Sequence, residues 1–154
     1  MHPNAQLIET FYSAFQRLDA ETMVSCYADS IRFSDPVFPQ LQGKEAGDMW
    51  RMLCAKAQDF ELTFSDVQAD ATTGSAKWEA KYTFSATGRR VHNRISANFS
   101  FADGLIVTHA DQFDFWKWSA MALGPMGALL GWTPFLRRKV QKQAAENLSR
   151  FSAG

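Results

Sequence analysis

Apolar residues recur at helical spacing three times in the first sixty positions of the chain. The first stripe predicts a helix that opens at Pro3, with Asn4 as its N-cap. Asp19 is suited to cap a second, short helix that ends around Ala28. The third stripe predicts a helix over residues 44–58. The buried stripe of the first helix consists of Leu7, Ile8, Phe11, Ala14, Phe15 and Leu18.

Beyond Phe60 the hydrophobic period changes from 3.6 residues to two, which is typical of strands that are buried on one face. Asp103-Gly104 is a strong hairpin signal between the last two strands. The expected strands are residues 31–35, 60–65, 76–84, 91–101 and 105–115. Helices followed by a run of antiparallel strands predict an α+β fold.

The last predicted strand carries a titratable pair on an otherwise apolar face. Alternation places His109 and Asp111 on the same side as Leu105, Val107 and Phe113. Burying such groups is costly unless they are partnered. Two interpretations follow, a core histidine satisfied by the aspartate or a functional site with perturbed pKa values.

Asp35 is a second carboxylate at the end of an apolar strand face. It follows Ile31 and Phe33 with strand spacing, and Pro36 holds it in an extended conformation. The sequence leaves two roles open for Asp35, a turn former and a functional carboxylate beside the pocket.

The C-terminal part of the chain is strongly apolar and then basic. Gly124-Pro125 breaks an apolar helix, and Thr133-Pro134 opens a final amphipathic helix that runs to Phe151. Its first turns carry the cations Arg137-Arg138-Lys139. One interpretation is contact with a membrane surface or a lipid. We favour the other, an apolar flap over the core with a solvated basic face.

Composition narrows the class of protein. A chain of 154 residues with 46% hydrophobic and 14% aromatic residues predicts one domain, 1–154, with an aromatic-lined interior. Zero net charge argues against a nucleic acid partner. Cys26 and Cys54 lack metal-ligand spacing, so we expect free thiols and no metal. Without a secretory signal or a transmembrane run, a cytoplasmic protein is expected.

Two segments resemble the nuclear transport factor 2-like superfamily, in its SnoaL-like and ketosteroid-isomerase-like branch. They are Y-A-D-S-I-R-F-S-D-P-V-F (27–38) and D-G-L-I-V-T-H-A-D-Q-F-D (103–114). The resemblance covers a core of residues 5–116 and leaves the flap and helix of 117–151 as an addition. It implies a cone-shaped, curved antiparallel sheet wrapped around the N-terminal helices, with a deep apolar pocket. It also implies a homodimer through the outer sheet face, which suits the polar residues of segment 92–100.

The resemblance also suggests roles for individual residues. Asp35 falls where ketosteroid isomerase keeps its general base, but Phe11 and Ala97 stand where that enzyme keeps its two oxyanion donors. Losing one such donor costs about 10²–10³ in rate, which argues against classical ketosteroid isomerisation. The segment 109–111 lies where SnoaL-like polyketide cyclases carry an H-x-D acid/base. The Asp-Arg-Asp set of limonene-epoxide hydrolases has a poor match, because Arg94-Ile95-Ser96 lacks the carboxylate.

The expected function is general acid–base chemistry on a small apolar molecule, of isomerase, cyclase or hydratase type and without cofactor. Asp35, His109 and Asp111 are the expected catalytic residues. The expected substrate-binding residues are Phe11, Tyr12, Trp50, Trp78, Tyr82, Phe84, Phe99 and Phe113. The alternatives are a non-catalytic module for a hydrophobic ligand and a protein associated with membrane surfaces or lipids.

Overall fold

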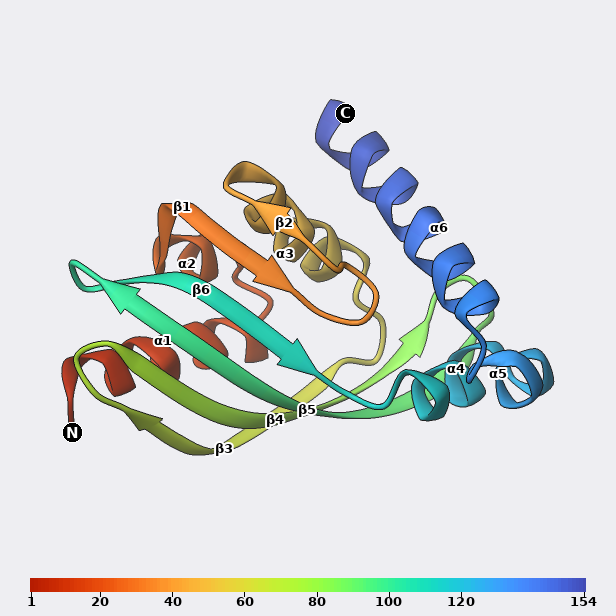
Figure 1. Ribbon diagram of the computed structural model, residues 1–154, viewed down its shortest axis with the longest axis horizontal. Coiled ribbons are helices and arrows are strands. Elements are labelled where there is room, and N and C mark those ends of the chain that lie inside the picture. The colour runs from red at the N-terminus through yellow and green to blue at the C-terminus, as the bar shows by residue number, and fades with distance from the viewer.

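The computed structural model describes residues 1–154, which form six helices and six strands (Figure 1). The elements are α1 (Pro3–Gln16), α2 (Ala20–Ser25), β1 (Tyr27–Ser34), β2 (Leu41–Gln42), α3 (Lys44–Lys56), β3 (Glu61–Ala69), β4 (Thr73–Phe84), β5 (Arg89–Ala102), β6 (Leu105–Gln112), α4 (Phe115–Leu123), α5 (Pro125–Leu130) and α6 (Pro134–Ala153). The expected combination of helices with a curved sheet is confirmed, and so is the added C-terminal helix.

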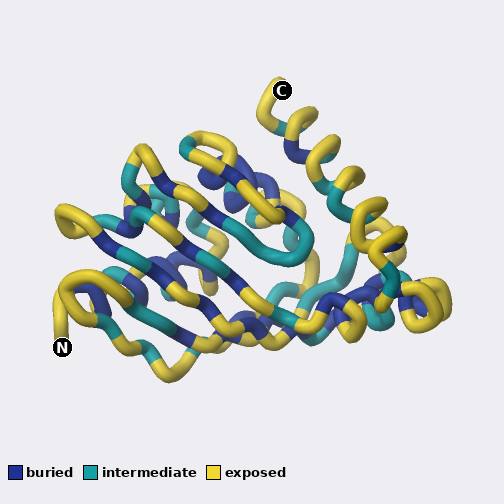
Figure 2. The backbone as a smooth tube through the Cα atoms, in the orientation of Figure 1, coloured by how far each residue is buried: buried dark blue, intermediate teal, exposed yellow.

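The sheet has the strand order β2-β1-β6-β5-β4-β3 and does not close on itself. Four of its five junctions are antiparallel, but β1 pairs with β6 in parallel. A purely antiparallel sheet was expected, but the observed sheet is mixed. The last strand, β6, lies between β1 and β5 and runs in the same direction as β1. Helices α1 and α3 pack on the inner face and supply its core together with the sheet. Figure 2 shows buried positions alternating with exposed ones along the strands, as expected when one face of each strand is covered.

The first helix begins differently from the prediction. Its N-cap is His2, whose Nδ1 accepts a hydrogen bond from the backbone N–H of Asn4 at 3.0 Å. Asn4 lies inside the helix instead, and its side-chain amide donates to the carbonyl oxygens of Asp70 and Ala71. The buried amide is stable here because its two N–H groups donate to carbonyl oxygens of the turn, which lie outside the hydrogen-bonded strands. Asn4 therefore fastens α1 to the turn between β3 and β4.

The second helix is shorter than expected. Asp19 caps it as predicted, accepting a hydrogen bond from the N–H of Thr22 at 3.1 Å. However, the helix ends at Ser25, and Tyr27 already pairs with Ile106 of the distant strand β6. This long-range pairing overrides local helix propensity, which is a weak preference. It turns Tyr27 from a helical residue into the first residue of a central strand.

Strand β6 contains a bulge at Val107. Its partners across the junction with β5 shift by one residue, since Ser100 faces Thr108 whereas Phe101 faces Ile106. Because an extra residue reverses the alternation, Ile106 is buried in place of Val107. The predicted inner face of this strand is therefore wrong before the bulge and right after it.

Helices α4 and α5 form a tight apolar hairpin, which we call the α4–α5 hairpin. Gly124 joins them with φ of 72°, a conformation that favours glycine. A Cβ atom at Gly127 would lie 1.8 Å from the carbonyl oxygen of Ser119, and one at Gly131 would lie 2.0 Å from its hydroxyl. These two glycines thus allow a close approach of the helices. The Ser119 hydroxyl donates to Gly127 O at 3.3 Å, which fixes the hairpin further.

Helix α6 runs back along α3, and two side-chain hydrogen bonds help to attach it to the rest of the fold. The Gln141 amide donates to the carbonyl oxygen of Pro36 at 3.0 Å, and the Ser152 hydroxyl donates to the buried carboxylate of Asp48 at 2.8 Å. The buried side of α6 includes Leu148, as its amphipathic pattern predicts. None of the helices combines the length and the apolarity that crossing a membrane requires.

Candidate functional site

The structure brings the pair predicted on β6 into direct contact. His109 and Asp111 are both buried, and Nε2 of the imidazole lies 2.9 Å from Oδ1 of the carboxylate. They follow the bulge at Val107, so the remaining alternation of the strand points both side chains to the inner face.

Tyr27 extends this pair into a chain of hydrogen bonds. Its hydroxyl oxygen lies 2.7 Å from Nδ1 of His109 and accepts a hydrogen bond from the indole N–H of Trp50 at 2.8 Å. Every proton has an acceptor if the Tyr27 hydroxyl donates to Nδ1 and the imidazole Nε2–H donates to Asp111. We therefore assign the neutral Nε2–H tautomer to His109. Burial raises the pKa of the Tyr27 hydroxyl, which keeps it a donor at neutral pH.

Aromatic rings surround the imidazole on several sides. The ring centroid of Phe99 is 4.4 Å away, that of Phe33 is 5.0 Å away with perpendicular planes, and that of Phe11 is 5.5 Å away. Trp50 stacks on the remaining face at 6.1 Å. Close packing of this kind fixes the orientation of His109.

Beside Asp111 lies the one buried polar side-chain atom without a protein partner, the hydroxyl of Tyr12. Burial raises the pKa of Tyr12, and the negative charge of Asp111 raises it further. Asp111 also accepts a long hydrogen bond of 3.4 Å from the indole of Trp78. An unsatisfied buried hydroxyl costs about 1–3 kcal/mol, so its position near a carboxylate requires an explanation.

Asp35 follows β1, where its carboxyl both forms a turn and is buried. Its Oδ1 accepts hydrogen bonds from the N–H groups of Val37 and Phe38 at 2.7 and 2.6 Å, so the turn-forming role is present. Burial nevertheless raises the pKa of this carboxyl to about 7. The two backbone hydrogen bonds and the charge of Arg137 act to lower the pKa, whereas the charge of Asp111 acts to raise it. The two carboxylates therefore interact electrostatically.

Tyr82 faces the same region as Asp35. Its hydroxyl oxygen accepts a hydrogen bond from the indole N–H of Trp118 at 2.9 Å, while its own proton has no acceptor in the protein. Burial raises the pKa of Tyr82, and the charge of Asp35 raises it further. Tyr82 thus offers one free hydroxyl donor near a carboxyl that titrates near neutral pH.

The expected pocket residues separate into two groups. Five are buried in the large core around His109, namely Phe11, Tyr12, Trp50, Trp78 and Phe99. Three are only partly buried and lie against the smaller apolar cluster that α4 builds, namely Tyr82, Phe84 and Phe113. We call this second region, together with Asp35, the Asp35–Tyr82 region.

Three residues of this region are not among the expected site residues. The sequence pattern places Tyr27 in a helix, although Tyr27 opens the segment that carries the family resemblance. Trp118 is one of several aromatics in an apolar run, and nothing in the sequence singles it out. Arg137 was grouped with a basic surface run, but its guanidinium lies 5.5 Å above the ring of Phe115. Only helix phase distinguishes it from its basic neighbours.

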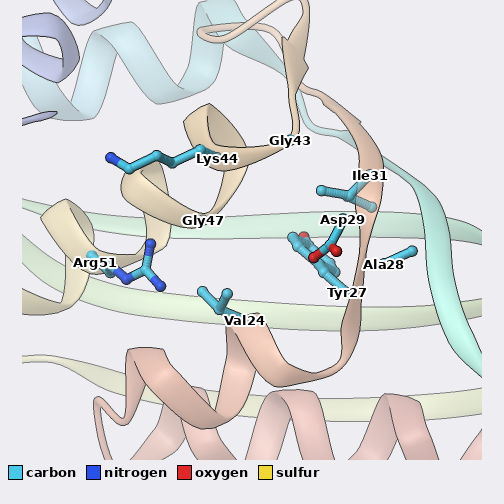
Figure 3. Close-up of a pocket in the computed structure, with 9 residues that line it drawn as sticks. All are labelled: Val24, Tyr27, Ala28, Asp29, Ile31, Gly43, Lys44, Gly47 and Arg51. Atoms are coloured by element: carbon cyan, nitrogen blue, oxygen red, sulfur yellow. The ribbon is translucent and has the colours of Figure 1, made fainter.

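A hollow of about 370 Å³ lies elsewhere, between α2, the start of β1 and α3 (Figure 3). None of the eleven expected site residues lines it. Its two cations are already paired, Arg51 with Glu21 and Lys44 with Asp48. They leave no free positive charge in the hollow to recognise an anion, and we assign it no ligand.

No group of three or more histidine, cysteine, aspartate or glutamate side chains is placed to hold a metal ion. Both cysteines are free thiols, and burial raises the pKa of Cys26 and of Cys54 to about 11. Such thiols are poor nucleophiles at neutral pH. The titratable groups that could take part in a reaction are therefore the carboxylates, the histidine and the tyrosines described above.

The curved sheet that wraps around α1 and α3 gives the chain the fold of solved nuclear transport factor 2-like proteins. Residues 8–109 match the family model of the SnoaL-like domain, and the chain belongs to this family. No curated protein sequence matches the chain.

Solved structures with similar folds carry diverse names. An LEH-like epoxide hydrolase of M. tuberculosis is 20% identical with a TM-score of 0.66, covering 83% of this chain and 95% of its own. A candidate polyketide cyclase of Xanthomonas campestris pv. campestris is 18% identical with a TM-score of 0.65, covering 77% and 96%. A ketosteroid-isomerase-like protein of Catenulispora acidiphila, in complex with trimethylamine, is 11% identical with a TM-score of 0.67, covering 83% and 97%. The TM-scores establish a shared fold. The sequence identities are too low to transfer a function, so the chemistry must be argued from the residues of this chain.

Proposed function

We propose that this SnoaL-like protein is a cofactor-independent enzyme that binds a small apolar molecule at the Asp35–Tyr82 region and moves protons by general acid–base catalysis. The observation that carries the proposal is the carboxyl of Asp35, whose pKa of about 7 matches the working range of a general base. Partly exposed aromatic side chains around it supply the apolar contacts for such a ligand.

The residues divide the work between them. Asp35 takes and returns the proton, and the free hydroxyl proton of Tyr82 donates to the oxygen that gains charge. This tyrosine serves in place of the two donors that ketosteroid isomerase keeps where Phe11 and Ala97 stand here. His109 and Asp111 act by position, because their fixed pair holds a negative charge that raises the pKa of Asp35.

The chemistry that suits this set is proton removal from a carbon next to a carbonyl. The Asp35 carboxylate removes the proton, the electron pair moves onto the carbonyl oxygen, and Tyr82 stabilises the resulting enolate. In a β,γ-unsaturated ketone the enolate is a dienolate, and return of the proton from Asp35 to its γ-carbon gives the conjugated isomer. If the enolate carbon instead attacks a second carbonyl of the same molecule, a C–C bond forms and Asp35 returns its proton to the new alkoxide, which gives a cyclised alcohol. No redox partner is required in either case.

The proposal is tested by deuterium exchange, which reports proton abstraction whatever the natural product is. A panel of cyclic and polycyclic ketones is incubated with the protein in heavy water, and incorporation at the α-carbon is followed by mass spectrometry. Asp35→Asn is expected to lower the exchange rate by about 10²–10⁴-fold. Asp103→Asn, in an exposed turn, is the matched control and should exchange at the parent rate. Exchange that survives Asp35→Asn, or no exchange by the parent, would contradict the proposal.

A second candidate function is a binding module without catalysis. One observation favours it, because the chain from Trp50 through Tyr27 and His109 to Asp111 is satisfied within the protein. Such closed networks also occur where they only specify a core. Ketone binding without α-exchange, measured by calorimetry on the parent protein, would favour this candidate.

Tyr12→Phe tests whether the unsatisfied hydroxyl of Tyr12 only destabilises the free protein or also binds a ligand oxygen. Deleting the hydroxyl should stabilise the free protein by about 1 kcal/mol, because no hydrogen bond is lost. If a ligand oxygen binds there, the same variant should bind ketones more weakly. Thermal unfolding with and without ligand measures both effects. A destabilised variant would show that the hydroxyl has a partner, such as a buried water molecule.

We also propose that two copies assemble through the outer sheet face. That face is polar, and Glu79 of β4 lies there within 2.8 Å of His92 and 3.4 Å of Arg94 on β5. Protein–protein interfaces commonly have a polar rim with bridging water molecules, which such a face can supply. Sedimentation equilibrium of the parent and of Arg94→Glu tests the assignment, with a shift toward monomer expected for the variant.

A further inference from the structure

A group of large apolar side chains lies exposed at one end of the molecule. Leu129 is 72% exposed, Trp132 is 65% exposed and Phe135 is 68% exposed, and these residues span the end of α5 and the start of α6. Trp116 and Met126 of the α4–α5 hairpin are also more than half exposed. Figure 2 shows α5 as a largely exposed projection at the end of the sheet. Soluble surfaces rarely expose so many large apolar residues in one place.

The hairpin is held rigidly in this exposed arrangement. Gly127 and Gly131 pack directly on Ser119 of α4, so the inner side of α5 is used for packing and its outer side faces away. The inner side of α6 is likewise buried through Leu136. The sequence predicts an apolar flap over the core. The inner residues of this segment pack as predicted, but its outer apolar residues are exposed and pack against no other part of the chain.

The two exposed tryptophans have no unsatisfied donor. The indole N–H of Trp116 donates to Ala128 O at 2.9 Å, and that of Trp132 donates to Leu129 O at 2.9 Å. An unpaired indole N–H would resist transfer into an apolar medium, and this pairing removes that cost. Both rings can therefore enter a less polar environment without breaking a hydrogen bond to water.

Positive charge borders this apolar surface. Phe135, Arg138, Lys139 and Lys142 are exposed and share one face of α6 by their three- and four-residue spacing. Lys117 is exposed beside Trp116 on α4. Between residues 115 and 145 there are five cations and no acid. The face therefore complements a negatively charged partner.

We propose that the α4–α5 hairpin and the exposed face of α6 form an interfacial anchor for membranes with anionic headgroups. Apolar rings and chains at the tip enter the headgroup region, and the basic side chains of α6 contact the lipid phosphates and carboxylates. A second copy of this chain fits less well, because a symmetric contact would place the same cations against each other.

Co-sedimentation with vesicles tests the anchor in the full chain. The parent should bind phosphatidylcholine vesicles that contain about 30 mol% phosphatidylserine, and it should not bind phosphatidylcholine alone. Binding should weaken strongly in about 1 M salt, where charges are screened beyond about 3 Å. No binding by the parent to the anionic vesicles would overturn the proposal.

Two sets of variants locate the contact. The triple variant Arg138→Gln, Lys139→Gln, Lys142→Gln should bind about 100-fold more weakly, since each cation at an anionic surface contributes roughly fivefold. The matched control Arg17→Gln, Lys44→Gln, Lys56→Gln removes one arginine and two lysines from exposed positions away from both this face and the outer sheet face, and it should bind like the parent. Equal weakening in both triples would overturn the proposal, because binding would then follow net charge alone.

The apolar tip is tested by Leu129→Ser with Phe135→Ser. Loss of vesicle binding is expected while thermal unfolding stays close to that of the parent, since both side chains are exposed. Sedimentation equilibrium of the same proteins tests whether a second copy of the chain binds this face instead of a membrane. A parent dimer that this double variant separates would assign the face to self-association and overturn the membrane assignment. The ketone exchange assay does not enter these outcomes.

Discussion

Replacing Asp35 with asparagine is expected to stabilise the protein at pH 8 and to leave its stability nearly unchanged at pH 4. The pKa of this carboxyl is about 7 in the folded protein, against about 3.9 in an unfolded chain. Between these values the folded state binds more protons, so stability falls as pH rises. Asparagine keeps an oxygen that can accept from Val37 and Phe38 without carrying the charge.

The size of this effect follows from the pKa difference. Three units correspond to about 4 kcal/mol at most, and partial solvent access to Asp35 reduces the expected gain to about 1–2 kcal/mol. The melting temperature at pH 8 should rise by roughly 3–6 °C. Thermal melts of the parent, Asp35→Asn and Asp103→Asn across pH 4 to 8 measure it. A parent whose stability does not fall over this range would show that Asp35 ionises normally.

Stability and exchange activity should therefore move in opposite directions in Asp35→Asn. A carboxylate kept only as a turn former has no reason to be buried at a stability cost, because asparagine makes the same turn. A catalytic carboxylate has such a reason, since destabilised groups are common where chemistry is done. Observing the gain and the loss together would distinguish these two explanations.

Trp50→Ala is expected to destabilise the protein by about 3–5 kcal/mol. Trp50 is almost fully buried, packs on Phe15, Phe33 and His109, and donates the hydrogen bond that orients Tyr27. The substitution removes a large side chain from the centre of the core and opens the chain of hydrogen bonds at its first member. The melting temperature should fall by roughly 10 °C or more.

Trp132→Ala is the matched control for this loss. It makes the same substitution at a position that is mostly exposed, and we expect a change within about 0.5 kcal/mol. Urea unfolding followed by far-UV circular dichroism measures both free energies. Similar losses in the two variants would mean that the core does not depend on Trp50.

Local sequence patterns determine much of this fold. Strand β5 buries Val91, Ile95 and Phe99 as its alternation predicts, because one face of a sheet packs on helices and the other meets water. The parallel pairing of β1 with β6 was not predictable in this way. It joins Tyr27 to Ile106, almost eighty residues later, and no local propensity encodes such a contact.

The candidate site shows the same division. His109 and Asp111 were predictable, because two titratable residues with strand spacing necessarily share a face. Trp118 and Arg137 were not, because their contacts depend on how α4 and α6 are rotated against the sheet. The raised pKa of Asp35 was also hidden, since burial comes from the whole fold and not from the Asp-Pro turn.

The bulge at Val107 has a consequence for comparing related sequences. Since Ile106 and Thr108 keep their partners on β5 while Val107 is left over, a relative without this extra residue can keep its histidine and aspartate on the inner face. Aligning this chain with such a relative needs a one-residue gap just ahead of the H-x-D segment. Without the gap, the upstream half of the strand would be shifted by one position and each residue would be given the wrong counterpart.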